Sequence, residues 1–165
     1  VSGELDWPMV QSTRDALLGS HRRDYHAFAY LHEEMGAALR AADLVVSRAG
    51  ASVLGEYPVL GLPSVLVPYP HAWRYQKVNA EYLTRRGAAV VVPDHRLNDD
   101  LLVTLNVLLE NPNKLKAMRA AMFELSHPRA AEKIASALVT MAASASGTTA
   151  TASAMANMSI PSADW

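Results

Sequence analysis

The chain alternates short apolar runs with amphipathic stretches as far as Pro93. The apolar runs have the length of buried strands, and they lie at residues 25–30, 44–47, 64–67 and 88–92. Between them, apolar positions recur with helical spacing, which predicts helices over residues 7–18, 32–42, 52–60 and 75–86. Gly61 and Gly87 each follow one of these helices, as glycine often does at a helix end. The alternation is typical of an α/β, Rossmann-like parallel sheet with helices on both faces.

Beyond residue 98 the pattern is helical. Helices are predicted over residues 99–110, 114–125 and 128–141. One apolar stripe on the second of these should pack on the sheet, and its members are Leu115, Met118, Ala121, Met122 and Leu125. Residues 142–165 are rich in Ala, Ser and Thr without periodicity, so we expect a disordered tail there. Residues 1–141 are expected to form one α/β domain that is incomplete at its N-terminus, because Val1 and Ser2 resemble the end of a strand.

Composition narrows the functions open to the chain. Its 165 residues carry a formal net charge of -1, so no basic excess favours a nucleic-acid partner. Cysteine is absent from the sequence, which excludes disulfides and thiolate chemistry within it. The apolar runs are far shorter than the roughly 20 residues that cross a bilayer.

The stretch that follows the strand at 44–47 has the features of an anion site. Ala49, Gly50 and Ala51 form a small-residue turn after Arg48, and the backbone of such a turn can approach a ligand closely. The helix that follows presents unpaired amides and the positive end of its dipole, which favour a diphosphate. Glu56, about one turn into the helix, can accept the two hydroxyls of a ribose. It is equally interpreted as a solvent-facing carboxylate that stabilises the helix N-terminus.

A second polar segment, residues 68–76, follows the strand at 64–67 and should lie at the carboxyl edge of the sheet, where α/β folds bind ligands. A metal site is not predicted. The sequence has no D-x-D pair to hold a divalent cation on a diphosphate, and Asp99 and Asp100 stand at a helix start, where acidic groups pair with the dipole. His21 to Arg23, a small basic cluster, are expected in a loop.

Three motifs of this region occur in order: S-R-x-G-A-x-x-x-x-E from Ser47, G-L-P-S-V-L-V-P-Y-P from Gly61 and R-x-Q-x-x-N-A from Arg74. Together they resemble the donor-binding, C-terminal half of the MurG-type N-acetylglucosaminyltransferases of the GT-B superfamily. The resemblance covers roughly Val1 to Leu138. It implies an inverting, metal-independent transfer of N-acetylglucosamine from UDP-N-acetylglucosamine to a lipid-linked acceptor. The product would be lipid II, for peptidoglycan synthesis, the cell wall and cell division.

The same resemblance implies roles for particular residues. Leu31, His32 and Met35 would bind the uracil base, His71 would steady the leaving diphosphate, and two adjacent polar residues would bind the transferred sugar. The chain departs from the family pattern in two places, with Ala49 where relatives often have Ser and Tyr75 where they have His or Gln. Gln76 matches, and Asn79 matches but could only brace the loop. The full donor-binding set is Leu31, His32, Met35, Arg48, Ala49, Gly50, Ala51, Glu56, His71, Tyr75 and Gln76.

The catalytic base and the lipid-linked acceptor would belong to an N-terminal domain that is missing from this sequence. The fragment alone is therefore expected to be inactive. The full-length enzyme would be cytoplasmic and peripheral at the inner face of the cell membrane. Two alternatives remain open: the donor half of another UDP-sugar transferase, of two-chain or natural-product type, and a non-catalytic α/β interaction domain in which the motifs are vestigial.

Overall fold

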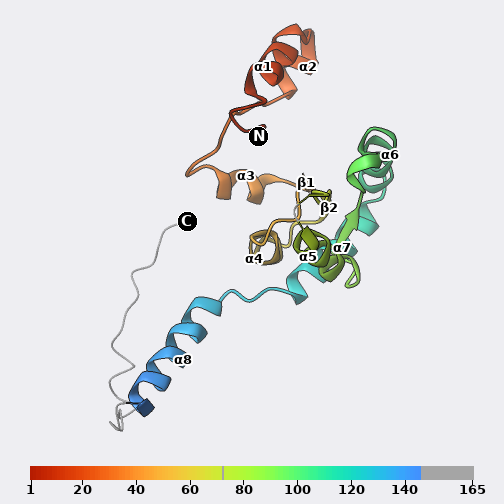
Figure 1. The fold of residues 1–165 in the computed structure, drawn as a ribbon. Coiled ribbons are helices and arrows are strands. Elements are labelled where there is room, and N and C mark those ends of the chain that lie inside the picture. Colours follow the sequence, from red (N-terminus) through yellow and green to blue (C-terminus); the bar gives the residue numbers. More distant parts are fainter. Residues whose placement is uncertain (72, 146–165) are drawn as a thin grey trace. The chain divides into compact units, whose positions relative to one another are not determined.

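A computed structural model describes residues 1–71 and 73–145, and Figure 1 traces them. The chain divides into two compact units, the first spanning Val1–Ala41 and the second beginning at Ala42.

The first unit is helical. It contains α1 (Trp7–Ala16), α2 (Gly19–Asp24) and α3 (Met35–Ala41), and none of these helices has a buried residue. The amides of Ser2 and Gly3 donate to the carbonyls of Phe28 and Ala29 at 3.1 and 2.9 Å. The predicted helix at 7–18 is confirmed as α1, which ends two residues earlier than predicted.

Two expectations for the first unit are wrong. Residues 25–30 form no strand. Within the described part of the chain, their backbone is held by the bonds that Phe28 and Ala29 accept from Ser2 and Gly3 and by the bond that Tyr25 donates to His21, whereas a strand needs a continuous ladder partner. The basic cluster from His21 to Arg23 lies in helix α2 rather than in a loop.

The second unit is built on a parallel sheet. Its strands are β1 (Val45–Ser47), β2 (Ser64–Leu66) and β3 (Ala89–Val91), in the order β1-β2-β3. The register pairs Ser47 with Leu66 and Leu66 with Val91, so the carboxyl ends of the strands are level. The apolar runs at 44–47, 64–67 and 88–92 are confirmed as strands, each slightly shorter than predicted.

Helices connect the strands and then follow the sheet. They are α4 (Val53–Leu60), α5 (Trp73–Thr84), the 3-10 turn η1 (Asp94–Arg96), α6 (Leu97–Leu109), α7 (Pro112–Glu124) and α8 (Ala130–Ala145). Gly61 ends α4 and Gly87 follows α5, with φ of 59° and 73°, a left-handed conformation that glycine adopts without steric cost. In both places the next amide reaches back to the helix, from Leu62 to Tyr57 and from Ala88 to Leu83, which satisfies a terminal carbonyl.

The core lies on both faces of β2. Val65 and Val67 pack with Val92, Leu108 of α6 and Met118 of α7 in one buried cluster. Leu66, which points to the opposite face by strand alternation, is also fully buried. Met118 and Met122, from the stripe predicted on the helix at 114–125, are buried as expected. The architecture is therefore the predicted Rossmann-like α/β fold.

The C-terminal end of the described chain is helical. Helix α8 continues to Ala145, four residues beyond the predicted end of that helix, and the rest of the expected tail, 146–165, lies outside the described residues. No helix in the described part of the chain is both long and apolar enough to cross a membrane.

Candidate functional site

Three loops leave the carboxyl ends of the strands and form what we call the rim: residues 48–52 after β1, 67–71 after β2 and 92–94 after β3. Because the strands end level, these loops start at the same edge of the sheet. Loops at the carboxyl ends of parallel strands are where open α/β sheets bind ligands.

The turn after β1 is held by side chains that bind its carbonyl groups. Asn79 of α5 donates from Nδ2 to the carbonyl of Ala49 at 3.0 Å, and Ser47 Oγ donates to the carbonyl of Arg48 at 2.9 Å. In a trans peptide the carbonyl and the following N–H point in opposite directions. Asn79 therefore fixes the direction of the Gly50 amide, and a Cβ added at Gly50 would meet nothing within 4 Å.

Helix α4 opens directly after this turn. Ser52 stands at its N-cap without a side-chain cap, and no described residue accepts a hydrogen bond from the amides of Ala51 or Ser52. Both residues are exposed. Free amides and the positive end of the helix dipole make this a favourable place for an anionic group, as the sequence predicts.

Glu56 lies in the first turn of α4 and is exposed. Its amide donates to the carbonyl of Ser52, while its carboxylate has no partner among residues 1–71 and 73–145. The next residue, Tyr57, is 5% exposed and donates its hydroxyl to Ser47 Oγ at 2.9 Å. Burial raises the pKa of Tyr57, and the nearby charge of Glu56 adds to this shift while the hydrogen bond to Ser47 opposes it. One side of the helix start is thus anchored, and the carboxylate on the other is free to bind.

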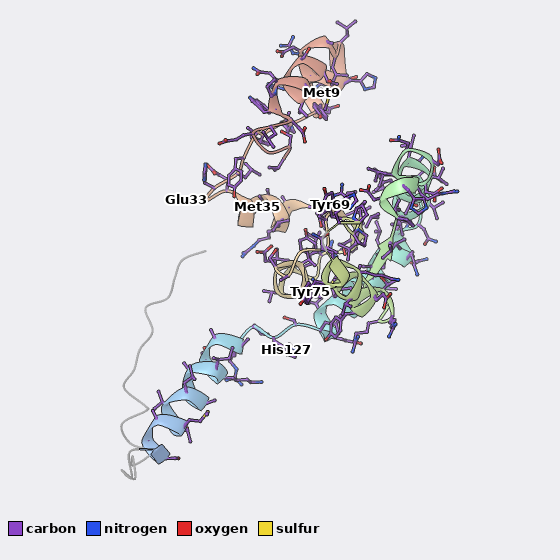
Figure 2. The ribbon with its side chains drawn as sticks, in the orientation of Figure 1. Met9, Glu33, Met35, Tyr69, Tyr75 and His127 are labelled. Carbon is purple, nitrogen blue, oxygen red and sulfur yellow. The ribbon has the colours of Figure 1, made fainter. Side chains whose placement is uncertain are left out.

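Arg48 connects all three loops of the rim. Its Nη1 donates to the carbonyl of Val67 at 3.2 Å and forms an ion pair with Asp94. Its guanidinium carbon lies 5.3 Å from the ring centre of Tyr69, within cation–π range. Tyr69 follows β2, and Figure 2 labels it.

Gln76 of α5 holds the middle loop. Its Oε1 accepts a hydrogen bond of 2.8 Å from the amide of Tyr69, and its Nε2 has no partner among the described residues. His71 is exposed and packs edge-on against Tyr69 with ring centres 5.5 Å apart. Tyr75, labelled in Figure 2 in the first turn of α5, is 71% exposed. The rim therefore carries several polar groups that face solvent.

The predicted donor-binding residues divide between the two units. Leu31 and Met35 are half-buried in the first unit, and His32 is exposed, with its ring 4.8 Å from that of Tyr30. The carbonyl of His32 accepts from the amide of Met35 at the start of α3. The second unit brings the other predicted residues together at the rim and the adjacent starts of α4 and α5: Arg48, Ala49, Gly50, Ala51, Glu56, His71, Tyr75 and Gln76.

Sequence reasoning missed Asp94 and the role of Tyr57. Asp94 follows Pro93 at the end of β3, so the carboxyl-edge rule that pointed to residues 68–76 would have found it too. Tyr57 gave no signal, since an aromatic residue on the inner side of a helix is normally core. Among the described residues, no group of three or more His, Asp or Glu side chains could hold a metal ion.

A family model described as the glycosyltransferase family 28 C-terminal domain matches residues 7–134. Several relatives are named UDP-N-acetylglucosamine--N-acetylmuramyl-(pentapeptide) pyrophosphoryl-undecaprenol N-acetylglucosamine transferase. The one from Roseiflexus sp. is 42% identical over 73% of this chain and 31% of its own length. The one from Listeria welshimeri is 37% identical over 84% of this chain and 38% of its own, and that from Moorella thermoacetica is 54% identical over 59% and 27%.

A crystal structure of Acinetobacter baumannii MurG has the same fold, with a TM-score of 0.65 and 25% sequence identity. The match covers 80% of this chain and 38% of that one. The chain therefore spans about a third of the length of the relatives that it matches.

Proposed function

Because the chain belongs to the glycosyltransferase family 28 C-terminal domain family, we propose that it is the donor-binding part of an inverting N-acetylglucosaminyltransferase that makes lipid II. Its donor would be UDP-N-acetylglucosamine, and the enzyme would act in peptidoglycan synthesis. The names of the relatives support both the donor and the lipid-linked acceptor.

The observation that carries the proposal is the start of α4, where uncapped amides stand about one turn from the unpartnered carboxylate of Glu56. This combination suits a nucleoside diphosphate, with phosphate at the amides and the ribose diol at the carboxylate. Ala51 and Gly50 would contribute backbone amides, which makes a hydroxyl at Ala49 unnecessary. Leu31, His32 and Met35 would bind the base, and His71, Tyr75 and Gln76 would face the diphosphate and sugar.

In the reaction, negative charge develops on the departing UDP. Fixed amides at a helix N-terminus stabilise such charge without reorganising, as an oxyanion hole does, so no metal need be invoked. The acceptor hydroxyl would attack from the opposite face of the sugar and give inversion. The base that removes its proton would come from an N-terminal acceptor domain, which would also bring the lipid-linked acceptor. We place the full-length enzyme in the cytoplasm, peripheral at the inner face of the cell membrane.

Calorimetry tests the nucleotide site. The chain should bind UDP in preference to ADP. Glu56→Gln should lower the affinity for UDP about tenfold, because a charged acceptor for two hydroxyls is lost. Glu110, the exposed C-cap residue of α6, provides the matched control, and Glu110→Gln should leave UDP binding unchanged. The parent should also prefer UDP to 2′-deoxy-UDP, and Glu56→Gln should abolish most of that preference.

Two results would overturn the assignment: equal affinity for UDP and ADP, or a Glu56→Gln chain that binds UDP as the parent does. Tyr75 favours a second candidate, a transferase for another UDP-sugar, since it replaces the residue expected at the first sugar contact. Tighter binding of UDP-glucose than of UDP-N-acetylglucosamine would select that candidate. Activity regained on adding the N-terminal half of a relative would exclude a non-catalytic domain.

A further inference from the structure

We propose that Arg48 is a positioning residue: it holds Tyr69 in place, Tyr69 orients the amide of Gln76, and Gln76 then binds the sugar of the donor. Arg48 thereby controls affinity for the sugar part of the donor rather than for its nucleotide part. This inference rests on the proposed function, because it assumes that a nucleotide-sugar occupies the rim.

The loop after β2 depends on side chains for its conformation. The last ladder bonds run from the amide of Val67 to Ser47 and from the amide of Val92 to Leu66, at 2.8 and 3.0 Å. Beyond them, no backbone–backbone hydrogen bond holds residues 68–71 to another described residue. Side chains do contact this loop: Arg48, Gln76 and His71 each interact with Tyr69.

Arg48 suits this task because its guanidinium is planar and has several donors. It lies against the Tyr69 ring, at 5.3 Å from its centre, and binds the carbonyl of Val67 two residues earlier. Asp94, from the loop after β3, pairs with the same Nη1 and so fixes the guanidinium from the other side. One side chain thus connects the three loops.

The connection reaches the ligand through Gln76. The amide of Tyr69 donates to Gln76 Oε1 at 2.8 Å, and this bond decides which end of the side-chain amide faces the loop. With Oε1 occupied, Nε2 is left to donate to a sugar hydroxyl. If Tyr69 moves, Gln76 loses the partner that sets its orientation, while the amides at the start of α4 are unaffected.

The Arg48–Asp94 pair should contribute little to stability. The two side chains are 47% and 32% exposed, and ion pairs open to solvent are weak. Loss of this pair should therefore change the affinity for the donor while leaving the thermal midpoint nearly unchanged. Arg96, the last residue of η1, and Asp100 of α6 form an ion pair of similar exposure, 51% and 35%, which provides a matched control.

The test measures the dissociation constants of UDP and UDP-N-acetylglucosamine by calorimetry for the parent, Arg48→Met, Gln76→Met, the double variant and Arg96→Met. Arg48→Met should weaken the binding of UDP-N-acetylglucosamine about fivefold and that of UDP less than twofold, since one hydrogen bond to the sugar is lost. Gln76→Met should give the same pattern. In the Gln76→Met background, Arg48→Met should add nothing, because both act through one contact. Arg96→Met should change neither constant.

Other results overturn the inference in distinguishable ways. Equal weakening of UDP and UDP-N-acetylglucosamine by Arg48→Met would mean that Arg48 contacts the nucleotide directly. Additive effects of the two substitutions would mean that Arg48 does not act through Gln76. A parent that binds UDP but gains nothing from the sugar would refute the role of Gln76 and leave the nucleotide site intact. A parent that binds no UDP would refute the proposed function itself, and this inference with it.

Discussion

Asn79 should be essential to the turn that follows β1, and Asn79→Asp tests this with almost no change of shape. The substitution places a carboxylate oxygen where Nδ2 now donates to the carbonyl of Ala49. Ala49 is fully buried, and its carbonyl has no other donor among the described residues. A buried acceptor left without a donor costs about 1–3 kcal/mol. We expect a loss of about 2 kcal/mol at neutral pH, or about 4–8 °C in the thermal midpoint for a chain of this size.

The loss of stability in Asn79→Asp should depend on pH. Beside a carbonyl, the introduced carboxyl is more stable protonated, so its pKa in the folded state is higher than in the unfolded state. The loss of stability should be complete above the folded pKa and should disappear below the unfolded value of about 4, where the protonated group can donate. Circular dichroism melts of the variant and the parent at pH 7 and at about pH 3.5 measure the difference.

Thr84→Val is the control for Asn79→Asp. Thr84 Oγ1 donates to the carbonyl of Ala80 in the same helix, but that carbonyl also lies within reach of the helical ladder. Its loss should cost under about 1 kcal/mol at either pH. The reasoning fails if Asn79→Asp is no more harmful than Thr84→Val, or if its effect is the same at both pH values. UDP affinity should fall with stability, since the Gly50 amide loses its fixed direction.

Two further predictions concern the packing of α4. Gly61→Ala should cost about 1–2 kcal/mol from its left-handed backbone, and somewhat more because the Phe123 ring must shift to make room for the new methyl. Gly87→Ala, with open space around it, should lose only the backbone part, and melts in a Phe123→Ala background should remove the excess. Burial raises the pKa of Tyr57 in the folded chain, so the contribution of its neutral hydroxyl to stability should be complete below the unfolded pKa of about 10 and should be lost as pH rises above that value. Tyr57→Phe should abolish this loss in melts between about pH 8 and 11, and a difference in thermal midpoint that stays constant with pH would contradict the prediction.

The strands of the second unit could be predicted because their signal is local. Each is an apolar run bounded by Gly, Pro or polar residues, and the helices between them end at Gly61 and Gly87. The segment 25–30 is also largely apolar, but among the described residues only Ser2 and Gly3 bond to it as a ladder would, and a local pattern does not reveal which segments will pair. The prediction of a strand at 25–30 was wrong for that reason.

The position of the candidate site in the fold could be predicted as far as the rule of the carboxyl edge applies. That rule pointed to residues 68–76, and the motifs pointed to Gly50, Glu56 and Gln76, without knowledge of any contact. The pair between Arg48 and Asp94 joins positions that are 46 residues apart, and it depends on the register of β1, β2 and β3. Such a contact follows from the assembled sheet and not from either residue alone.

The strand order β1-β2-β3 follows the order of the chain, so neighbours in the sheet are also successive in sequence. As a result, every loop of the rim is encoded by the uninterrupted stretch from residue 47 to residue 94. Recombination between two homologous genes at the flanks of this stretch would exchange all the loops at once, together with Arg48 and Asp94. Partners that evolved together would then stay together, whereas a crossover inside the stretch would separate them.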